Sequence, residues 1–216
     1  MLRYQRILVS CVLALSLLLA VSFSAECKKS LGARTLVPPC PVWVIGSYDS
    51  TGTPNMMTAS WVGICCSDPP SVTVSLTKSR YSYGNIMASR AFTVNIPSEA
   101  YAKETAFFGS VSGRDLDKFA ATGLNHVGSE LVNAPYLAEF PLVVECRLVQ
   151  TVEVGSHTMF IGEIVDVKAN EDILGEGDRL DPLKLQGFLF FPGSGNFYST
   201  GGSIGTIRDL QAEIER

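Results

Sequence analysis

The alternation of apolar and polar positions along this chain predicts strands far more often than helices. The clearest case is a hairpin in which a strand at residues 42–48 passes through the polar turn 49–54 into a second strand at 55–64. The tight turn Gly155-Ser156 is expected to join two long strands. Strands beyond the hairpin are predicted at residues 71–77, 91–96, 142–153, 157–168 and 187–191.

Helical stretches are few and short. A helix N-terminus needs a side chain that accepts its free N–H groups, and Ser82 and Ser98 are placed to do so. Helices are predicted at residues 83–89, 99–107, 115–121 and 207–214. Because a parallel sheet needs longer crossover helices, the pattern favours a mainly β, antiparallel barrel. The Gly/Ser-rich segment 193–206 is predicted to be a loop over this subunit or a partner subunit.

Residues 1–25 differ from the rest of the chain. Arg3 and Arg6 precede an apolar run at residues 7–23, and small residues follow up to Ala25. A positive start, an apolar stretch and a small-residue end are typical of a secretory signal peptide. The segment therefore predicts an exported protein, or a membrane-anchored one if it is not cleaved. If the extension is not real, the alternative is a cytoplasmic protein.

Charge excludes one class of partner. The chain carries 17 Lys and Arg against 21 Asp and Glu, a formal net charge of −4, which becomes −6 once residues 1–25 are removed. Lys and Arg do not cluster beyond pairs. Because binding to a phosphate backbone needs a basic patch, we expect no nucleic acid partner.

The cysteines predict neither a metal site nor a disulfide framework. Five cysteines follow residue 25, no two of them form a CxxC pair, and the chain has two histidines. No metal is therefore expected. The preferred interpretation is that these cysteines are small buried apolar residues. A redox role for Cys65 and Cys66 is less favoured, because a reactive thiol needs an electropositive setting and Asp68 lies close in sequence.

Six short motifs occur along the chain in a fixed order. They are Cys40–Gly46, Pro54–Trp61, Asp68–Pro70, Lys78–Ile86 running into Phe92–Pro97, Ser112–Phe119, and Gly155–Glu163. Each motif is weak alone, but the ordered series resembles the flavin reductase-like, flavoredoxin-like family of FMN-binding split-barrel proteins. The resemblance covers about residues 30–205. It implies a domain at residues 28–216 that is an antiparallel Greek-key split β-barrel, and a homodimer with FMN at or near the subunit interface.

The phosphate of FMN needs N–H donors, hydroxyl groups and positive charge. One segment offers all three just before a predicted helix: Thr77, Lys78, Ser79, Arg80, Tyr81 and Ser82. Arg80 can add a two-pronged contact with a phosphate. Apart from the resemblance, the same residues also fit a solvated turn in which Ser82 caps the helix.

The isoalloxazine ring of FMN needs hydrogen bonds at one edge and dry cover on its faces. The resemblance implies that a second segment supplies backbone groups to the ring: Thr58, Ala59, Ser60 and Trp61. The small side chains of Ala59 and Ser60 permit close approach. Trp61 packs near the ring in this interpretation, and is an ordinary core tryptophan in the alternative one.

His157 is the candidate catalytic residue. The resemblance implies that it lies close to the flavin and to the nicotinamide site, where it can orient a donor, hydrogen-bond the reduced ring or relay a proton. The alternative is a partly exposed strand histidine. Ser112, Arg114 and Lys118 form a second set, which reaches the phosphate, lies at the dimer interface or is simply exposed at the surface.

The leading functional hypothesis is an FMN-dependent oxidoreductase. It takes electrons from NAD(P)H or from a redox protein partner through bound FMN. The sequence contains no GxGxxG loop, so NAD(P)H is expected to bind transiently over the flavin. Two alternatives stay open: a non-enzymatic FMN-binding electron carrier without NAD(P)H activity, and a barrel that has lost its cofactor.

Overall fold

The computed structural model describes residues 28–214. Contacts divide the chain into residues 1–35 and 36–216. The described part of the first unit has no helix or strand, and every element named below belongs to the second. The predicted leader, residues 1–25, lies outside the described residues. Within the described range, no helix is long and apolar enough to cross a membrane.

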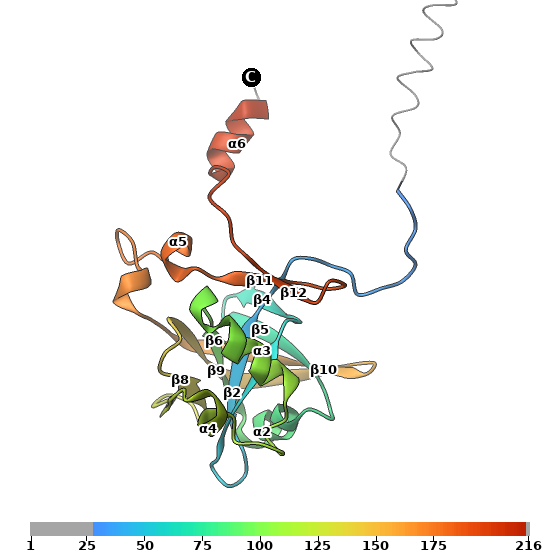
Figure 1. Cartoon of the computed structure of the whole chain (residues 1–216), viewed down its shortest axis with the longest axis vertical. Helices are drawn as coiled ribbons and strands as arrows, with labels where there is room; N and C mark the ends of the chain where they lie inside the picture. Colours follow the sequence, from blue (N-terminus) through green and yellow to red (C-terminus); the bar gives the residue numbers. More distant parts are fainter. Residues whose placement is uncertain (1–27, 215–216) are drawn as a thin grey trace, which may run out of the picture. The chain divides into compact units, whose positions relative to one another are not determined.

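Seven antiparallel strands form the main sheet, in the order β3-β2-β6-β9-β10-β5-β4 (Figure 1). Their bounds are Trp43–Tyr48 (β2), Pro54–Ala59 (β3), Val62–Ser67 (β4), Pro70–Thr77 (β5), Ala91–Ile96 (β6), Leu142–Val154 (β9) and His157–Ala169 (β10). β3 and β4 are the two edges of this sheet, yet Ser60 and Trp61 alone separate them along the chain. The sheet must therefore curl until its edges approach each other, which makes a barrel that is split between β3 and β4.

The return of β6 gives the barrel its Greek-key order. β2, β3, β4 and β5 follow one another around the barrel, and the chain then passes through helix α2 (Tyr81–Ser89) so that β6 lies beside β2. This arrangement confirms the predicted mainly β, antiparallel split barrel with a few short helices.

The remaining elements are short. Two small sheets hold β1 (Cys40–Pro41), β11 (Phe188–Phe191) and β12 (Asn196–Ser199), and β7 (His126–Gly128) with β8 (Pro135–Leu137). The other helical segments are η1 (Glu99–Tyr101), α3 (Ala102–Ser110), α4 (Lys118–Thr122), η2 (Glu171–Ile173), α5 (Pro182–Leu185) and α6 (Ile207–Ile214). Figure 1 shows α2 and α4 at the same end of the barrel.

The barrel interior is apolar because alternate residues of each strand point inward. On β5, Val72, Val74 and Leu76 are buried, whereas Thr73 and Ser75 between them are only half-buried. The buried residues that share this interior also include Ile45, Met57, Ile86, Phe92, Val94, Cys146, Leu148 and Phe160. A second apolar cluster, which joins β2 and β3 to α3, consists of Val44, Met56, Phe108, Leu137 and Phe140.

The prediction of one strand over residues 55–64 is wrong. The strand β3 ends at Ala59, and β4 begins at Val62 with a different partner, β5. The alternation of side chains continues through Ser60 and Trp61, and neither residue is Gly or Pro. The sequence pattern therefore did not predict the break between the two strands. A strand was also missed inside the Gly/Ser-rich segment 193–206, where β12 pairs with β11.

Three helix starts were also predicted wrongly. Ser98 was expected to cap a helix at residues 99–107, but its side chain makes no capping hydrogen bond to η1, and α3 begins at Ala102. α2 begins at Tyr81, so Ser82 lies within its first turn, and the side chain of Ser82 is buried rather than capping. α4 begins at Lys118, where the Asp117 side chain accepts hydrogen bonds from two backbone N–H groups. The expectation that the cysteines are buried holds for Cys146 and fails for the exposed Cys65 and Cys66, because they lie on the edge strand β4.

Candidate functional site

A cavity of about 270 Å³ lies at the corner where the barrel is split, and we call it the corner cavity. It is bordered by the end of β3, the Ser60-Trp61 link, the end of β5 and the start of β10. The lining residues are Met57, Thr58, Ala59, Ser60, Trp61, Ser75, Leu76, Thr77, Arg80 and His157. The split in the barrel therefore leaves room beside backbone that is not covered by a neighbouring strand.

A larger cavity of about 570 Å³ adjoins it, and we call it the cationic cavity. It lies between the start of α2, the end of α3 and the segment 111–118 that leads into α4. Its charged lining residues are Arg80, Arg114, Asp115 and Lys118. Met57, Thr77 and Arg80 border both cavities, so the two form one continuous cleft. Three cations against one acid make this end of the cleft suited to an anion in a protein whose net charge is negative.

Lys118 is the buried cation of this cavity. Its side chain is 4% exposed, and Nζ donates hydrogen bonds to the carbonyl oxygens of Met56 (2.7 Å) and Phe108 (2.9 Å). Burial and, to a smaller extent, repulsion from Arg80 together lower the pKa of Lys118 to about 8. No carboxylate pairs with Lys118 among the described residues. An anion in the cavity would therefore stabilise the charged form.

Arg114 and Tyr81 form the outer wall of the cationic cavity. The guanidinium of Arg114 lies 5.1 Å from the centre of the Tyr81 ring and donates a hydrogen bond to the carbonyl oxygen of Ser79 (3.0 Å). The Tyr81 hydroxyl donates to Asp49 Oδ2 (2.7 Å), which lowers the pKa of Asp49 together with hydrogen bonds from Thr51. These contacts hold the segment before α2 in place.

Asn55 lies on the floor of the same cavity with a polar atom unmatched. Its side chain is 4% exposed, and Nδ2 donates to Ser82 Oγ (2.9 Å). Within residues 28–214, Asn55 Oδ1 has no hydrogen-bond partner. A Cβ atom at Gly113 would come within 2.1 Å of this oxygen, so only glycine fits against it. The floor of the cavity thus holds polar groups that a polar ligand can match.

His157 and Trp61 form the wall of the corner cavity. In the sheet, His157 lies between Val154 of β9 and Thr77 of β5. Its Nδ1 lies 2.9 Å from Ser156 Oγ, and its ring centre lies 4.7 Å from that of Trp61 with the planes inclined at 39°. Trp61 is 44% exposed, so it is not the ordinary core tryptophan of the alternative interpretation.

The structure brings nearly all the predicted site residues to this cleft. Thr58, Ala59, Ser60, Trp61, Thr77, Arg80 and His157 line the corner cavity, and Thr77, Ser79, Arg80, Tyr81 and Ser82 line the cationic cavity. Lys78 lines neither, because its Nζ pairs with Glu153 Oε2 (2.9 Å). All three residues of the second set, Ser112, Arg114 and Lys118, border the cationic cavity. Sequence reasoning missed Asn55, although it lies within one of the motifs. The roles of these residues in binding remain predictions.

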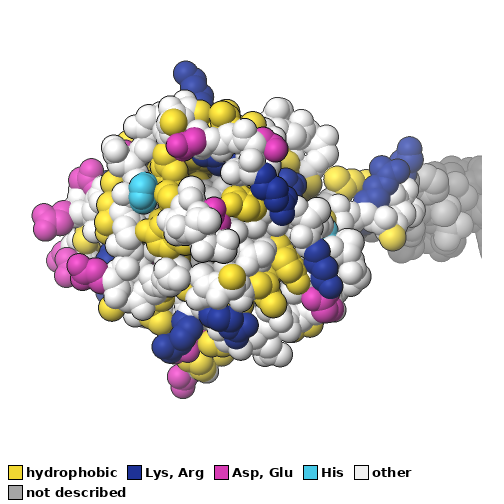
Figure 2. Space-filling model, turned by 90° about the horizontal axis from the view of Figure 1, so that it is seen from below, with side chains coloured by type: hydrophobic (Ala, Val, Ile, Leu, Met, Phe, Trp, Pro, Cys, Tyr) yellow, Lys and Arg dark blue, Asp and Glu magenta, His cyan; other side chains and the backbone are white. Residues whose placement is uncertain are grey.

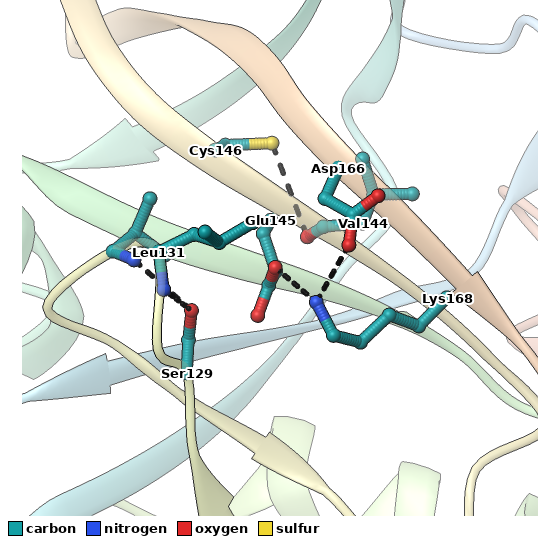
Figure 3. A network of polar contacts seen from close by, with 8 residues as sticks. Ser129, Leu131, Val144, Glu145, Cys146, Asp166 and Lys168 are labelled. Atoms are coloured by element: carbon teal, nitrogen blue, oxygen red, sulfur yellow. Dashed lines mark hydrogen bonds and ion pairs between the residues drawn. The ribbon is translucent and has the colours of Figure 1, made fainter.

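A second buried charge lies near the other end of β10 (Figure 3). Glu145 of β9 is fully buried, and its Oε2 accepts a hydrogen bond from Lys168 Nζ, which also donates to Asp166 Oδ2 (2.7 Å). Lys168 borders a third cavity of about 270 Å³, which does not include Glu145. No group of three or more metal-ligating side chains occurs among the residues that the structure describes.

Surface charge is mixed on the face shown in Figure 2. Lys and Arg side chains on this face lie in small groups among acidic and uncharged ones, without a continuous basic stripe.

Comparison with known proteins places this chain in a family. The model of the flavin reductase like domain matches residues 38–190. The solved structure of the flavoredoxin of Desulfovibrio vulgaris (Miyazaki F) is similar, with a TM-score of 0.80 and 46% identity over 83% of this chain and 97% of that chain.

Curated relatives share parts of the chain. A high molecular weight rubredoxin of Moorella thermoacetica is 38% identical over 52% of this chain and 48% of its own length. The reductase component of a 4-nitrophenol 4-monooxygenase/4-nitrocatechol 2-monooxygenase of Rhodococcus opacus is 33% identical over 55% of this chain and 60% of its own. The alignments span from 48% to 64% of the lengths of several such relatives. The match of the domain model and the split-barrel fold together show that the chain belongs to the flavin reductase-like domain family.

Proposed function

We propose that this protein is an FMN-dependent oxidoreductase. The observation that carries the proposal is the continuous cleft, which joins a cationic end to a corner bordered by Trp61 and by exposed backbone. FMN has the matching parts, a phosphate dianion at one end and a flat ring at the other. The relatives named as flavoredoxin and as a monooxygenase reductase component support a flavin-linked redox role.

The cationic cavity would hold the phosphate. The side chains of Arg80 and Lys118 supply charge, and the first turn of α2 supplies free N–H groups beside Ser79 and Ser82. The unmatched polar atom of Asn55 and the close approach of Gly113 also fit a polar group at this place. Lys78 takes no part in this scheme, because Glu153 already binds its ammonium group.

The corner cavity would hold the ring. Thr58, Ala59 and Ser60 would offer backbone groups at the split, where none of the described strands pairs with the free edge of β3. Bound FMN supplies the chemistry of accepting and releasing two electrons. The chain would bind and orient it, Trp61 and Leu76 would give the ring apolar contacts, and His157 would present an imidazole at the rim.

The electron donor and the assembly belong to the proposal as well. NAD(P)H would bind transiently against the open side of the corner cavity, where orientation beside His157 would favour hydride transfer. A homodimer would cover Ile64 of β4, which is 80% exposed and does not line the corner cavity. Residues 1–25 would direct export or anchoring.

A second candidate function is a flavoredoxin-like electron carrier with a redox protein partner and no NAD(P)H activity. The 46% identity to a flavoredoxin favours it. The visible spectrum of the purified protein tests both candidates, because bound FMN gives a flavin spectrum and a colourless protein that takes up no FMN would reject both. Anaerobic addition of NADH and NADPH then separates them: rapid bleaching supports the enzyme, and bleaching only by a reduced protein donor supports the carrier.

Arg80→Ala tests the phosphate end. Loss of a charge-assisted hydrogen bond should weaken FMN binding by about 1.5–3 kcal/mol. Arg147→Ala is the matched control, since Arg147 is an exposed arginine that pairs with Glu163 outside the cleft. Equal FMN affinity in the two variants would remove Arg80 from the site.

A further inference from the structure

The partner of His157 at the corner cavity is a hydroxyl group. Nδ1 lies 2.9 Å from Ser156 Oγ, and Ser156 is the hydrogen-bond partner of the imidazole among the described residues. A hydroxyl group can donate a hydrogen bond and can accept one, whereas a carboxylate only accepts and an ammonium group only donates. The bond to Ser156 therefore orients the imidazole and leaves its tautomer open.

Packing orients the imidazole ring of His157 without selecting one of its two tautomers. The imidazole lies against Trp61 with 4.7 Å between ring centres, and the backbone of His157 is held between two strands, β9 and β5. His157 borders the corner cavity, and with Nδ1 bound to Ser156 its other ring nitrogen, Nε2, has no hydrogen-bond partner among the described residues. When the Ser156 hydroxyl donates to Nδ1, Nε2 carries a hydrogen and is a donor. When Nδ1–H donates to Ser156 Oγ, Nε2 is an acceptor.

We propose that Ser156 is a positioning residue that lets His157 offer Nε2 as a donor to oxidised flavin and as an acceptor to reduced flavin. The proposal rests on the proposed binding of FMN in the cleft. Reduction of a flavin by a hydride adds two electrons and one proton, and converts a ring nitrogen from a hydrogen-bond acceptor into an N–H donor. A side chain that hydrogen-bonds this nitrogen in both redox states must therefore change from a hydrogen-bond donor to an acceptor.

The change from donor to acceptor moves one proton off the imidazole and one onto it. Nε2 releases a proton to solvent and Nδ1 takes one from solvent, while the Ser156 hydroxyl rotates from donor to acceptor. One proton is lost and one is gained, so the exchange leaves the charge of the imidazole unchanged, and the bond between His157 and Ser156 is kept in both states. Because the corner cavity is open to solvent at Trp61, water can carry both protons.

The test reads the tautomer of His157 directly, from the ¹⁵N chemical shifts of its two ring nitrogens. In the wild-type protein we expect both tautomers without FMN, the Nε2–H tautomer with oxidised FMN, and the Nδ1–H tautomer with reduced FMN. Ser156→Thr keeps the hydroxyl and should keep this change. Ser156→Asp accepts only, and should hold the proton on Nδ1 in all three states.

Affinity provides the second readout. Ser156→Ala removes the orienting bond and should weaken both oxidised and reduced FMN by roughly two- to tenfold, with Ser156→Thr restoring the wild-type values. Ser194→Ala, in the turn before β12, is the matched control and should change neither readout.

Two failures are distinguishable. If FMN binds to the wild-type protein and His157 keeps one tautomer in both redox states, the inference about Ser156 is wrong and the proposed function stands. If FMN does not bind, the proposed function is wrong and the inference falls with it. A single tautomer in the FMN-free wild-type protein that is also unchanged in Ser156→Asp would overturn the inference by itself.

Discussion

The molecule buries two charged side chains in different ways. Glu145 is fully buried and accepts a hydrogen bond from Lys168, so its negative charge is paired with a positive charge from the same chain (Figure 3). Lys118 is 4% exposed and borders the cationic cavity, and within residues 28–214 its ammonium group bonds only to the neutral carbonyl groups of Met56 and Phe108. A buried charge is costly unless it is paired.

This difference separates a structural charge from a binding charge. The chain pairs Glu145 with Lys168, although Glu145 Oε1 has no hydrogen-bond partner among the described residues, and none of the three cavities described above includes Glu145. It leaves Lys118 with an uncompensated charge that faces open space and the second cation Arg80, which lowers the pKa of Lys118. We infer that the free energy lost at Lys118 on folding is recovered when an anion binds.

The largest effect is expected at the structural pair. Lys168→Met leaves Glu145 buried without its cation and should lower the free energy of unfolding by about 3 kcal/mol, measured by urea denaturation. FMN affinity should not change, because Lys168 lies outside the cleft. Adding Glu145→Gln to this variant should restore most of the stability. A loss below about 1 kcal/mol would show that Glu145 does not depend on Lys168.

At Lys118 we expect a loss of FMN affinity. Lys118→Met should weaken FMN binding by about 2 kcal/mol, because one charge-assisted contact with the phosphate is lost. Riboflavin, which has no phosphate, should bind to the variant as it does to the wild-type protein. Lys103→Met changes an exposed lysine of α3 and serves as the control. An equal loss of affinity for FMN and for riboflavin would mean that Lys118 supports the fold and does not bind the phosphate.

The titration of Lys118 gives a smaller effect. Its pKa, which is about 8, should rise when a phosphate binds beside it. FMN affinity should then be full below pH 8 and fall with increasing pH above it, by about tenfold at pH 9. Titration by flavin fluorescence from pH 7 to 9.5 checks this. A flat profile, or the same fall in Lys118→Met, would contradict the assignment.

The smallest effect is expected at Lys78. Its ammonium group is paired with Glu153 at the surface, and such exposed pairs contribute little. Lys78→Ala should therefore change FMN affinity by less than about threefold, or roughly 0.5 kcal/mol. A loss as large as that of Arg80→Ala would mean that Lys78 leaves Glu153 to bind the phosphate.

The sequence predicted most strands and the end of the barrel that carries the cleft. Alternation places Val72, Val74 and Leu76 in the core, and turn residues mark the hairpins. The break at Ser60 and Trp61 could not be predicted from alternation, because the change there is one of pairing partner rather than of polarity. Closure of the barrel decides it.

The site residues were predicted less evenly, because side-chain partners are not encoded by spacing. The sequence pattern makes Lys78 and Arg80 equally good candidates for binding a phosphate. In the structure, however, Lys78 pairs with Glu153, which lies far along the chain. The burial of Lys118 and the unmatched oxygen of Asn55 depend on how α3 and α4 pack against β3. These properties appear only when the chain has folded.

The most direct test of this account compares the affinities of the wild-type protein for FMN and riboflavin by fluorescence titration at pH 7. Because the cations of the cleft should bind the phosphate, we expect FMN to bind at least about a hundredfold more tightly, with inorganic phosphate competing. Equal affinities for the two flavins, unaffected by inorganic phosphate, would contradict the account.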